Sequence, residues 1–212
     1  MVATLAACVG EAPEPGASTT DDAAPTTTST VPTTTEPATT SAPSTTSPAP
    51  RYVFPLRPAE AAGYSQGHHD YPATDILTPV GTEFLAPTSG TVDWVSRTDP
   101  WDPAVDDPAS RGGLSVAIVG DDGVRYYGSH LSEVTAGLEP GARVEAGDVL
   151  GRTGRSGNAA GTDPHLHFGI SHPTTPEDWR VRRGEVDPFP YLGAWGSGED
   201  ITPSLPTTRP PP

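Results

Sequence analysis

The sequence contains no lysine, and its 12 basic residues are all arginines, set against 27 aspartates and glutamates. Every chemistry that depends on a lysine is therefore excluded, including Schiff-base catalysis, the P-loop and lipoyl or biotinyl carriers. The net charge of −15 argues against nucleic acid or anionic lipid as a partner, because both attract a basic surface. The sequence also has no apolar run long enough to span a bilayer.

Only one cysteine is present, Cys8, so an internal disulfide is excluded. The residues Leu5-Ala6-Ala7-Cys8 resemble a bacterial lipobox, whose cysteine is lipidated after signal cleavage. The apolar run before Cys8 is short and lacks basic residues, so either the natural start lies further upstream or the match is accidental. With the lipobox interpretation, we expect an extracytoplasmic protein, either wall-associated or anchored to the membrane only through a lipid on Cys8.

The composition divides the chain into four parts, of which residues 1–10 are the lipobox segment. Residues 11–50 contain 13 Thr, 8 Pro and 5 Ser, with Val31 as their single large apolar residue. Such a segment cannot bury enough apolar surface to offset its loss of conformational entropy, so we expect a disordered linker. We expect residues 196–212, which are polar and proline-rich, to form a disordered tail. Residues 51–195 suffice for one domain with a core.

The segment 51–195 has the pattern of an all-β fold. Short apolar runs alternate with clusters of Gly, Pro and Asp, and no stretch shows sustained helical periodicity. Residues 120–123 favour a hairpin turn in which Gly123 takes a positive φ. The expected strands are Glu83–Leu85, Thr91–Val95, Leu114–Val119, Val124–His130, Arg143–Val144, Val149–Arg152 and His165–Ile170.

Histidines and one aspartate provide the candidate site. All six histidines lie between residues 68 and 172, and His165 and His167 are two apart in an expected strand, where both side chains point to one face. A catalytic zinc site usually takes three His or carboxylate ligands and leaves a fourth position for water, while a spare imidazole nearby serves as base or stabiliser. The histidines at 68, 69, 130, 165 and 167, together with Asp75, satisfy that requirement.

Several spaced motifs resemble the lysostaphin/LytM family of zinc endopeptidases that cut peptidoglycan peptides, in an actinobacterial-type, lipobox-bearing form. Residues 75–92, 127–132, 141–157 and 164–168 carry the resemblance, in the order found in the family. The strongest match is the last motif, Pro164-His165-Leu166-His167-Phe168. The resemblance implies a compact antiparallel β-sheet domain of the LytM type.

The resemblance also implies a Zn2+ ion held by a first-motif histidine, Asp75 and His167, with His130 and His165 as catalytic residues beside the reacting water. The family usually places its first histidine four residues before the aspartate, where this chain has Tyr71. His69 has the same parity as Asp75 in an extended strand, so we predict His69 rather than His68 as the third ligand. Pro72 can disturb that parity, which keeps His68 open as the alternative.

We therefore expect a zinc metalloendopeptidase, a peptidoglycan hydrolase that cleaves stem peptides or crosslinks through metal-activated water. The alternative is a catalytically inactive LytM-like domain that binds the wall or activates an amidase. Such a domain typically loses metal ligands, whereas every motif position here has a suitable occupant. No feature of the sequence decides between Gly–Gly bonds and diaminopimelate-containing crosslinks as the substrate.

Overall fold

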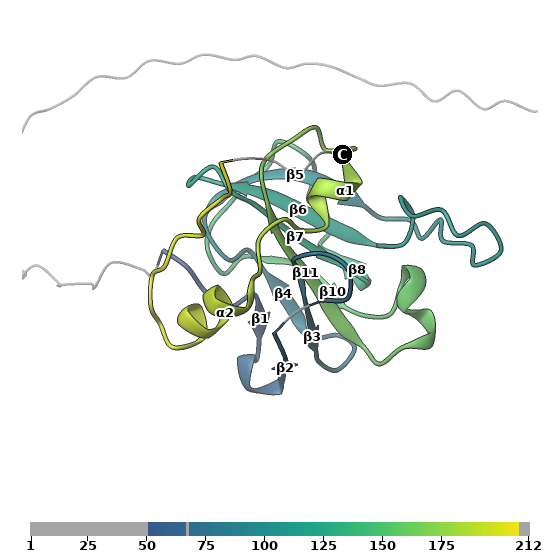
Figure 1. The fold of residues 1–212 in the computed structure, drawn as a ribbon, viewed down its shortest axis with the longest axis horizontal. Helices are drawn as coiled ribbons and strands as arrows, with labels where there is room; N and C mark the ends of the chain where they lie inside the picture. The colour runs from purple at the N-terminus through teal and green to yellow at the C-terminus, as the bar shows by residue number, and fades with distance from the viewer. Residues whose placement is uncertain (1–50, 67, 208–212) are drawn as a thin grey trace, which may run out of the picture. The chain divides into compact units, whose positions relative to one another are not determined.

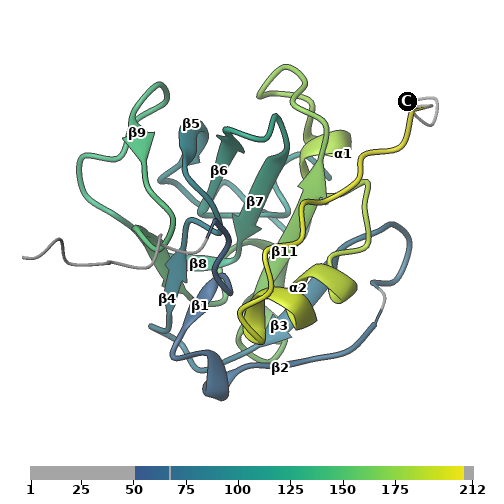
Figure 2. The same cartoon turned by 90° about the vertical axis from the view of Figure 1, so that its left-hand side faces the viewer.

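The computed structural model describes residues 51–66 and 68–207, and these form two antiparallel β-sheets with short helices (Figures 1 and 2). Residues 1–10 and 11–50, for which we expect a lipobox and a linker, lie outside the described part. The strands are β1 (Leu56–Arg57), β2 (Gly63–Tyr64), β3 (Thr74–Leu77), β4 (Glu83–Leu85), β5 (Gly90–Ser96), β6 (Ser115–Gly120), β7 (Arg125–Ser129), β8 (Leu131–Val134), β9 (Arg143–Val144), β10 (Val149–Thr153) and β11 (His165–Ser171). The α-helices are α1 (Trp179–Arg182) and α2 (Phe189–Gly196), and the 3-10 helices are Ala59–Ala61 and Gly157–Gly161.

The larger sheet has the strand order β2-β3-β11-β7-β6-β5-β9, and the smaller sheet has the order β1-β4-β10-β8. Side chains from both sheets form one apolar core. The sheets pack so closely that a Cβ atom on Gly128 of β7 would lie 2.5 Å from the ring of Phe84 in β4. This antiparallel architecture confirms the all-β fold class expected from the alternating apolar runs.

Strand β11 contributes side chains both to the core and to the candidate site, because alternate residues of a β-strand point to opposite faces of the sheet. Leu166, Phe168 and Ile170 are fully buried members of the core. His165 and His167 alternate with them and therefore point to the opposite face of the sheet. Because β11 lies between β3 and β7, side chains from both of these strands lie next to His165 and His167.

All seven expected strands are present, with boundaries that differ by no more than one residue. The hairpin at residues 120–123 is also confirmed, because Gly123 has φ of 77° and its N–H donates to the carbonyl of Gly120. Sequence analysis missed β3 and β8, which are four residues long, and the very short β1 and β2. It also missed the two α-helices, because four and eight residues are too few to establish a helical period.

The C-terminal segment differs from the disordered tail expected for residues 196–212, because residues 196–207 pack against the domain. The carboxylate of Asp200 accepts a hydrogen bond from the Tyr52 backbone N–H at 3.0 Å, and the Trp195 indole N–H donates to the Ile201 carbonyl at 2.9 Å. The Trp195 ring also stacks on Tyr52, with centroids 5.2 Å apart. Residues 196–207 are therefore ordered by contacts with the rest of the domain, which could not be inferred from the polar composition of this segment. Among the described residues, no helix has the length and apolar character needed to cross a membrane.

Candidate metal centre and active site

The pairing of three strands sets the centre of the site. His167 in β11 lies directly opposite Asp75 in β3 and opposite Ser129 in β7. Residues that face each other across an antiparallel pair have Cβ atoms about 4.5–5.5 Å apart and point to the same face. His167 Nδ1 lies 2.9 Å from Asp75 Oδ1. The register of the sheet therefore joins two side chains that are 92 residues apart in the sequence.

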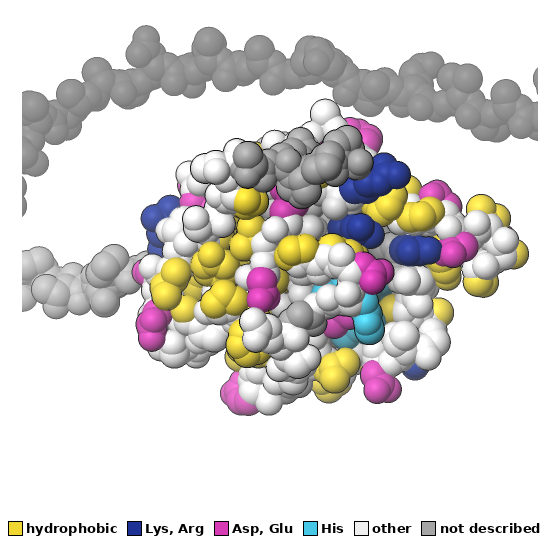
Figure 3. Space-filling view, viewed as in Figure 1, with side chains coloured by type: hydrophobic (Ala, Val, Ile, Leu, Met, Phe, Trp, Pro, Cys, Tyr) yellow, Lys and Arg dark blue, Asp and Glu magenta, His cyan; other side chains and the backbone are white. Residues whose placement is uncertain are grey.

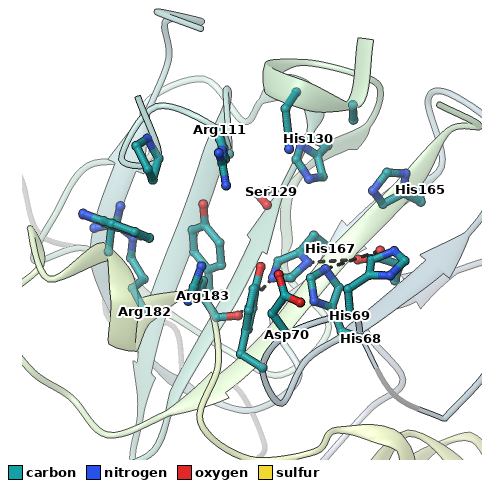
Figure 4. A pocket seen from close by; sticks show the side chains of 18 of the residues that line it. His68, His69, Asp70, Arg111, Ser129, His130, His165, His167, Arg182 and Arg183 are labelled. Carbon is teal, nitrogen blue, oxygen red and sulfur yellow. Dashed lines mark hydrogen bonds and ion pairs between the residues drawn. The ribbon is translucent and has the colours of Figure 1, made fainter. Parts of the chain in front are cut away.

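The third member of the group is His68, in the segment that precedes β3. His68 Nε2 lies 3.6 Å from Asp75 Oδ2, and the His68 and His167 ring centroids are 4.9 Å apart. One ligand atom from each of His68, Asp75 and His167 lies within 4.8 Å of the others. These three residues form a group that could hold a metal ion. Figure 4 shows two of them, His68 and His167, side by side.

His69, the ligand predicted from strand parity, does not join this group within the described residues. His69 and Asp75 would point to the same side only if the chain were extended from residue 69 to residue 75. Strand β3 begins at Thr74, however, and residues 69–72 form a bend. The bend turns His69 to an exposed position at the cavity, with its ring 5.4 Å from that of His68. The group that could hold a metal ion therefore contains His68, the alternative considered from the sequence, and not His69.

The hydrogen bonds of His167 show that the group suits a cation. His167 Nε2 lies 3.0 Å from the Arg183 carbonyl oxygen, which can only accept, so Nε2 carries the hydrogen. In the neutral ring the Nδ1 lone pair then faces the Asp75 carboxylate, an arrangement that needs a proton or a cation between them. Gly169 permits the bond to Arg183, because a Cβ there would lie 2.3 Å from that carbonyl. A backbone carbonyl that orients a ligating imidazole in this way is a common feature of metal sites.

His130 occupies the junction of β7 and β8 with a left-handed backbone, at φ of 64°. This conformation costs a residue other than glycine roughly 1–2 kcal/mol, so surrounding contacts must maintain it. The His130 N–H donates to the Gly112 carbonyl at 3.0 Å, and ring Nδ1 lies 2.9 Å from the Ser156 carbonyl. Nδ1 therefore carries the hydrogen, which leaves Nε2 as the acceptor of the neutral ring.

His165 has the same arrangement on the neighbouring strand. Its Nδ1 lies 2.8 Å from the Asp163 carbonyl, so this ring too has Nε2 as its acceptor when neutral. The His130 and His165 centroids are 4.8 Å apart, and the His130 and His167 centroids are 6.0 Å apart. The structure thus brings together both histidines predicted as catalytic and places them beside the His68–Asp75–His167 group.

The environment of the site favours neutral rings at His68 and His130 and a charged carboxylate at Asp75. Burial, together with the nearby His167, lowers the pKa of His68 to about 4. Burial is also the main reason that the pKa of His130 falls to about 3, with smaller effects from His167 and His165. Burial alone would raise the pKa of Asp75, but its close contact with His167 and the other nearby histidines lower it to about 2. Neutral imidazole and ionised carboxylate are the forms that bind a metal.

A cavity of about 340 Å3 contains all five of these side chains and has a second, basic wall. Figure 4 shows the histidines on one side and Arg111, Arg182 and Arg183 on the other. Tyr71 also lines the cavity, and its ring centroid lies 4.4 Å from that of His68. Sequence analysis missed the basic wall. The run Arg180-Val181-Arg182-Arg183 was its only signal, and it follows the last recognised motif.

The sequence of the chain is similar to those of known peptidases. The sequence profile of Peptidase family M23 matches residues 69–182, more than half of the chain. The chain is 33% identical over 89 residues to an L-Ala–D-Glu endopeptidase of Bacillus subtilis (strain 168), which covers 40% of the chain and 26% of that protein. It is 30% identical over 148 residues to a glycyl-glycine endopeptidase of Staphylococcus capitis, which covers 67% of the chain and 34% of that protein. The chain therefore spans about a quarter to a third of these relatives' lengths.

The fold is similar to that of a lytM protein from Ruminococcus gnavus ATCC 29149, whose crystal structure has been solved. The TM-score is 0.53 at 23% sequence identity, and the similarity covers 71% of this chain and 62% of that one. At this identity the comparison concerns the fold alone, and it agrees with the antiparallel arrangement of β3, β7 and β11. The family profile begins at His69, so the assignment of His68 rests on the geometry of the site.

Proposed function

The chain belongs to peptidase family M23, and from this we propose that it is a zinc-dependent endopeptidase that hydrolyses peptide bonds in the stem peptides or crosslinks of peptidoglycan. The observation that carries the proposal is the assembly of His68, Asp75 and His167 into one possible metal group beside His130 and His165. Two imidazoles and one carboxylate, with further titratable groups nearby, are a donor set typical of catalytic zinc.

His68, Asp75 and His167 would hold the metal. When bound, zinc supplies Lewis-acid chemistry, since it polarises a carbonyl and makes water acidic near neutral pH. The Arg183 carbonyl keeps His167 in the tautomer whose Nδ1 lone pair is directed at the group. Tyr71 remains a neutral phenol, because burial raises its pKa to about 12. Tyr71 therefore adds an uncharged aromatic ring to the cavity wall beside the metal group. Such a ring limits the access of bulk water to the reacting groups.

His165 and His130 supply proton acceptors. Carbonyl partners retain the hydrogen of each ring on Nδ1, so each Nε2 can accept a hydrogen bond or a proton from water. We propose that His165 Nε2 takes the proton of the attacking water. Burial lowers the pKa of His130 to about 3, so we propose that its neutral ring orients water by accepting a hydrogen bond. Stabilisation of an oxyanion by His130 would require the ring to be protonated first, because its Nδ1 hydrogen is directed at the Ser156 carbonyl.

The first prediction compares the two adjacent histidines. Purified wild-type protein is expected to retain one zinc ion per chain and to release soluble peptides from peptidoglycan. His68→Ala should lose both properties, because His68 provides a ligand within 4.8 Å of the others. His69→Ala should keep both, because His69 is exposed and does not belong to the group of possible ligands. Elemental analysis after dialysis and chromatography of the digest provide the two measurements.

The pair of variants also tests the alternative function. A wild-type chain that binds zinc but releases no peptide from wall material would contradict the endopeptidase and favour a wall-binding or amidase-activating domain. If His69→Ala lost zinc and His68→Ala kept it, the geometric assignment of the ligand would be wrong while the enzyme proposal remained. The assembled metal group favours the enzyme, because an inactive domain has no need of a complete donor set.

We also propose an extracytoplasmic location, with Cys8 as a lipid attachment point and residues 11–50 as a spacer. Cys8 and the spacer lie outside the described residues, so this proposal rests on the lipobox and on the wall substrate. Cells expressing the full gene product should carry it in the membrane fraction, and Cys8→Ser should shift it to the wall fraction or medium. Equal distribution of the two proteins would contradict the anchor and leave the catalytic proposal intact.

A further inference from the structure

The basic wall of the cavity stands out in an otherwise acidic protein. Three of the chain's 12 arginines line this one cavity, whereas only two carboxylates, Asp70 and Asp75, line it, and Asp75 belongs to the metal group. Figure 3 shows dark blue basic side chains gathered near the cyan histidines on the same face. A cavity with this charge attracts anionic groups, and the metal would add to the attraction.

Arg111 and Arg182 already have partners. Arg111 forms an exposed ion pair with Asp106 at 2.7 Å. Arg182 is almost fully buried, lies over the Trp94 ring at 3.9 Å, and donates to the Pro176 carbonyl. These two arginines contribute charge to the wall, and each guanidinium already has one polar partner, although the buried Nε of Arg182 has no acceptor.

Arg183 differs because its guanidinium has no polar partner in the described part of the chain. None of the ion pairs formed there includes Arg183, and its buried Nε lacks a hydrogen-bond acceptor. The guanidinium is nevertheless positioned, 3.8 Å above the Tyr71 ring and 5.1 Å from that of Trp179. Stacking on two rings orients the plane of the guanidinium. The N–H donors at the edge of that plane are left for a hydrogen-bond acceptor.

Arg183 is also tied to the metal group through its own backbone. Its carbonyl accepts the hydrogen bond from His167 Nε2 at 3.0 Å, and Tyr71, on which its side chain stacks, also contacts His68. A ligand on the guanidinium would therefore lie close to a peptide bond placed at the metal group. An arginine edge forms two parallel hydrogen bonds with a carboxylate, which gives both affinity and orientation.

We propose that Arg183 binds a free carboxylate of the substrate peptide next to the bond that is cut. The inference rests on the proposed endopeptidase function and narrows its substrate class to acidic peptides, in preference to neutral oligoglycine. Arg182 and Arg183 both line the cavity and both have a buried Nε without an acceptor, but Arg182 already donates to the Pro176 carbonyl. Among the described cavity arginines, Arg183 is the one whose guanidinium forms no hydrogen bond or ion pair with the protein. The carboxylate belongs either to an acidic residue within the peptide or to its C-terminus.

The experiment uses one zinc-loaded protein and a matched set of peptides. A peptide with an L-Ala–D-Glu bond is prepared with both carboxylates free, with only the Glu carboxylate amidated, and with only the C-terminus amidated; pentaglycine is the neutral reference. Wild-type protein should cut the fully acidic peptide with a kcat/KM about 10–100-fold above one amidated form, the range expected for a charge-assisted hydrogen bond. The amidation that lowers the rate identifies the carboxylate that Arg183 binds.

Arg183→Gln should reduce this ratio to a few-fold. Arg180→Gln is the control, because it removes the same charge from the same segment and also stacks on Trp179, but Arg180 is exposed and outside the cavity. The control should keep the wild-type ratio. Equal wild-type rates on acidic and amidated peptides, or an equal loss of the ratio in both variants, would overturn the inference.

A binding measurement separates this inference from the proposed function. Calorimetric titration of wild-type protein with the acidic and amidated product peptides should show the same preference, and it requires neither turnover nor a variant. If no peptide is cut while the acidic peptide still binds more tightly, the endopeptidase proposal fails and the carboxylate site stands. If peptides are cut without a preference in rate or binding, the carboxylate site is wrong and the endopeptidase proposal stands.

Discussion

Replacing His167 with alanine is expected to remove both zinc and hydrolytic activity. His167 is almost fully buried, lies opposite Asp75 in the sheet, and contributes one of the three ligand atoms. Loss of a residue that merely supports a ligand typically costs 10–100-fold in metal affinity or activity, and loss of a ligand should cost more. Zinc per chain, measured after dialysis, should fall from one to near zero.

His172→Ala provides the matched control for this result. His172 directly follows β11, is the same residue type and pairs with Glu185 at 2.9 Å, but it does not line the cavity. The control should keep its zinc and its activity on peptidoglycan. Full retention of zinc by His167→Ala would show that the metal binds elsewhere, and equal loss in both variants would point to a general defect in folding.

Replacing His165 with alanine is expected to lower kcat by about 10²–10⁴-fold while zinc remains bound. Its Nδ1 is held by the Asp163 carbonyl, so the variant removes a proton acceptor without removing a metal ligand. Steady-state hydrolysis of a defined peptide and elemental analysis on the same preparation separate the two properties. Normal turnover with normal zinc would show that another group accepts the proton.

His130 needs a different substitution because of its backbone. At φ of 64° an alanine would retain the strain and lose the ring, whereas asparagine tolerates this conformation better. We therefore expect His130→Asn to fold and bind zinc but to lose much of its activity. If His130→Asn is slow and His69→Ala is fully active, activity depends on where a histidine lies relative to the metal group and not on the number of histidines in the cavity.

The fold class could be predicted because β-strands have a local signature. Alternating apolar residues and Gly–Asp turns identified the seven expected strands and placed Gly123 in its hairpin. The missed strand β3 shows the limit of this pattern. Its residues Thr74–Leu77 contain only one buried aliphatic side chain, Ile76, and the strand forms because β11 is available as a partner.

The types of residue at the site were also predictable, but their arrangement depended on tertiary structure. His165 and His167 share a face because a strand repeats every two residues, so the sequence was sufficient for that pair. The parity argument that chose His69 assumed an extended chain, and the bend at residues 69–72 brings His68 to Asp75 instead. A bend of this kind depends on what the segment packs against, and here the Tyr71 ring contacts both His68 and His167.

The sequence by itself thus determined the types of residue at the candidate site, the absence of lysine chemistry and the antiparallel class, since each of these is a property of residue types and short-range periodicity. Only the tertiary structure decided which of two adjacent histidines completes the metal group. It also decided that Arg183 faces the cavity without a partner and that residues 196–207 pack on the domain. The physical reason is the same in each case. These features depend on contacts between segments distant in the sequence, and the local conformational propensities of the residues do not specify such contacts.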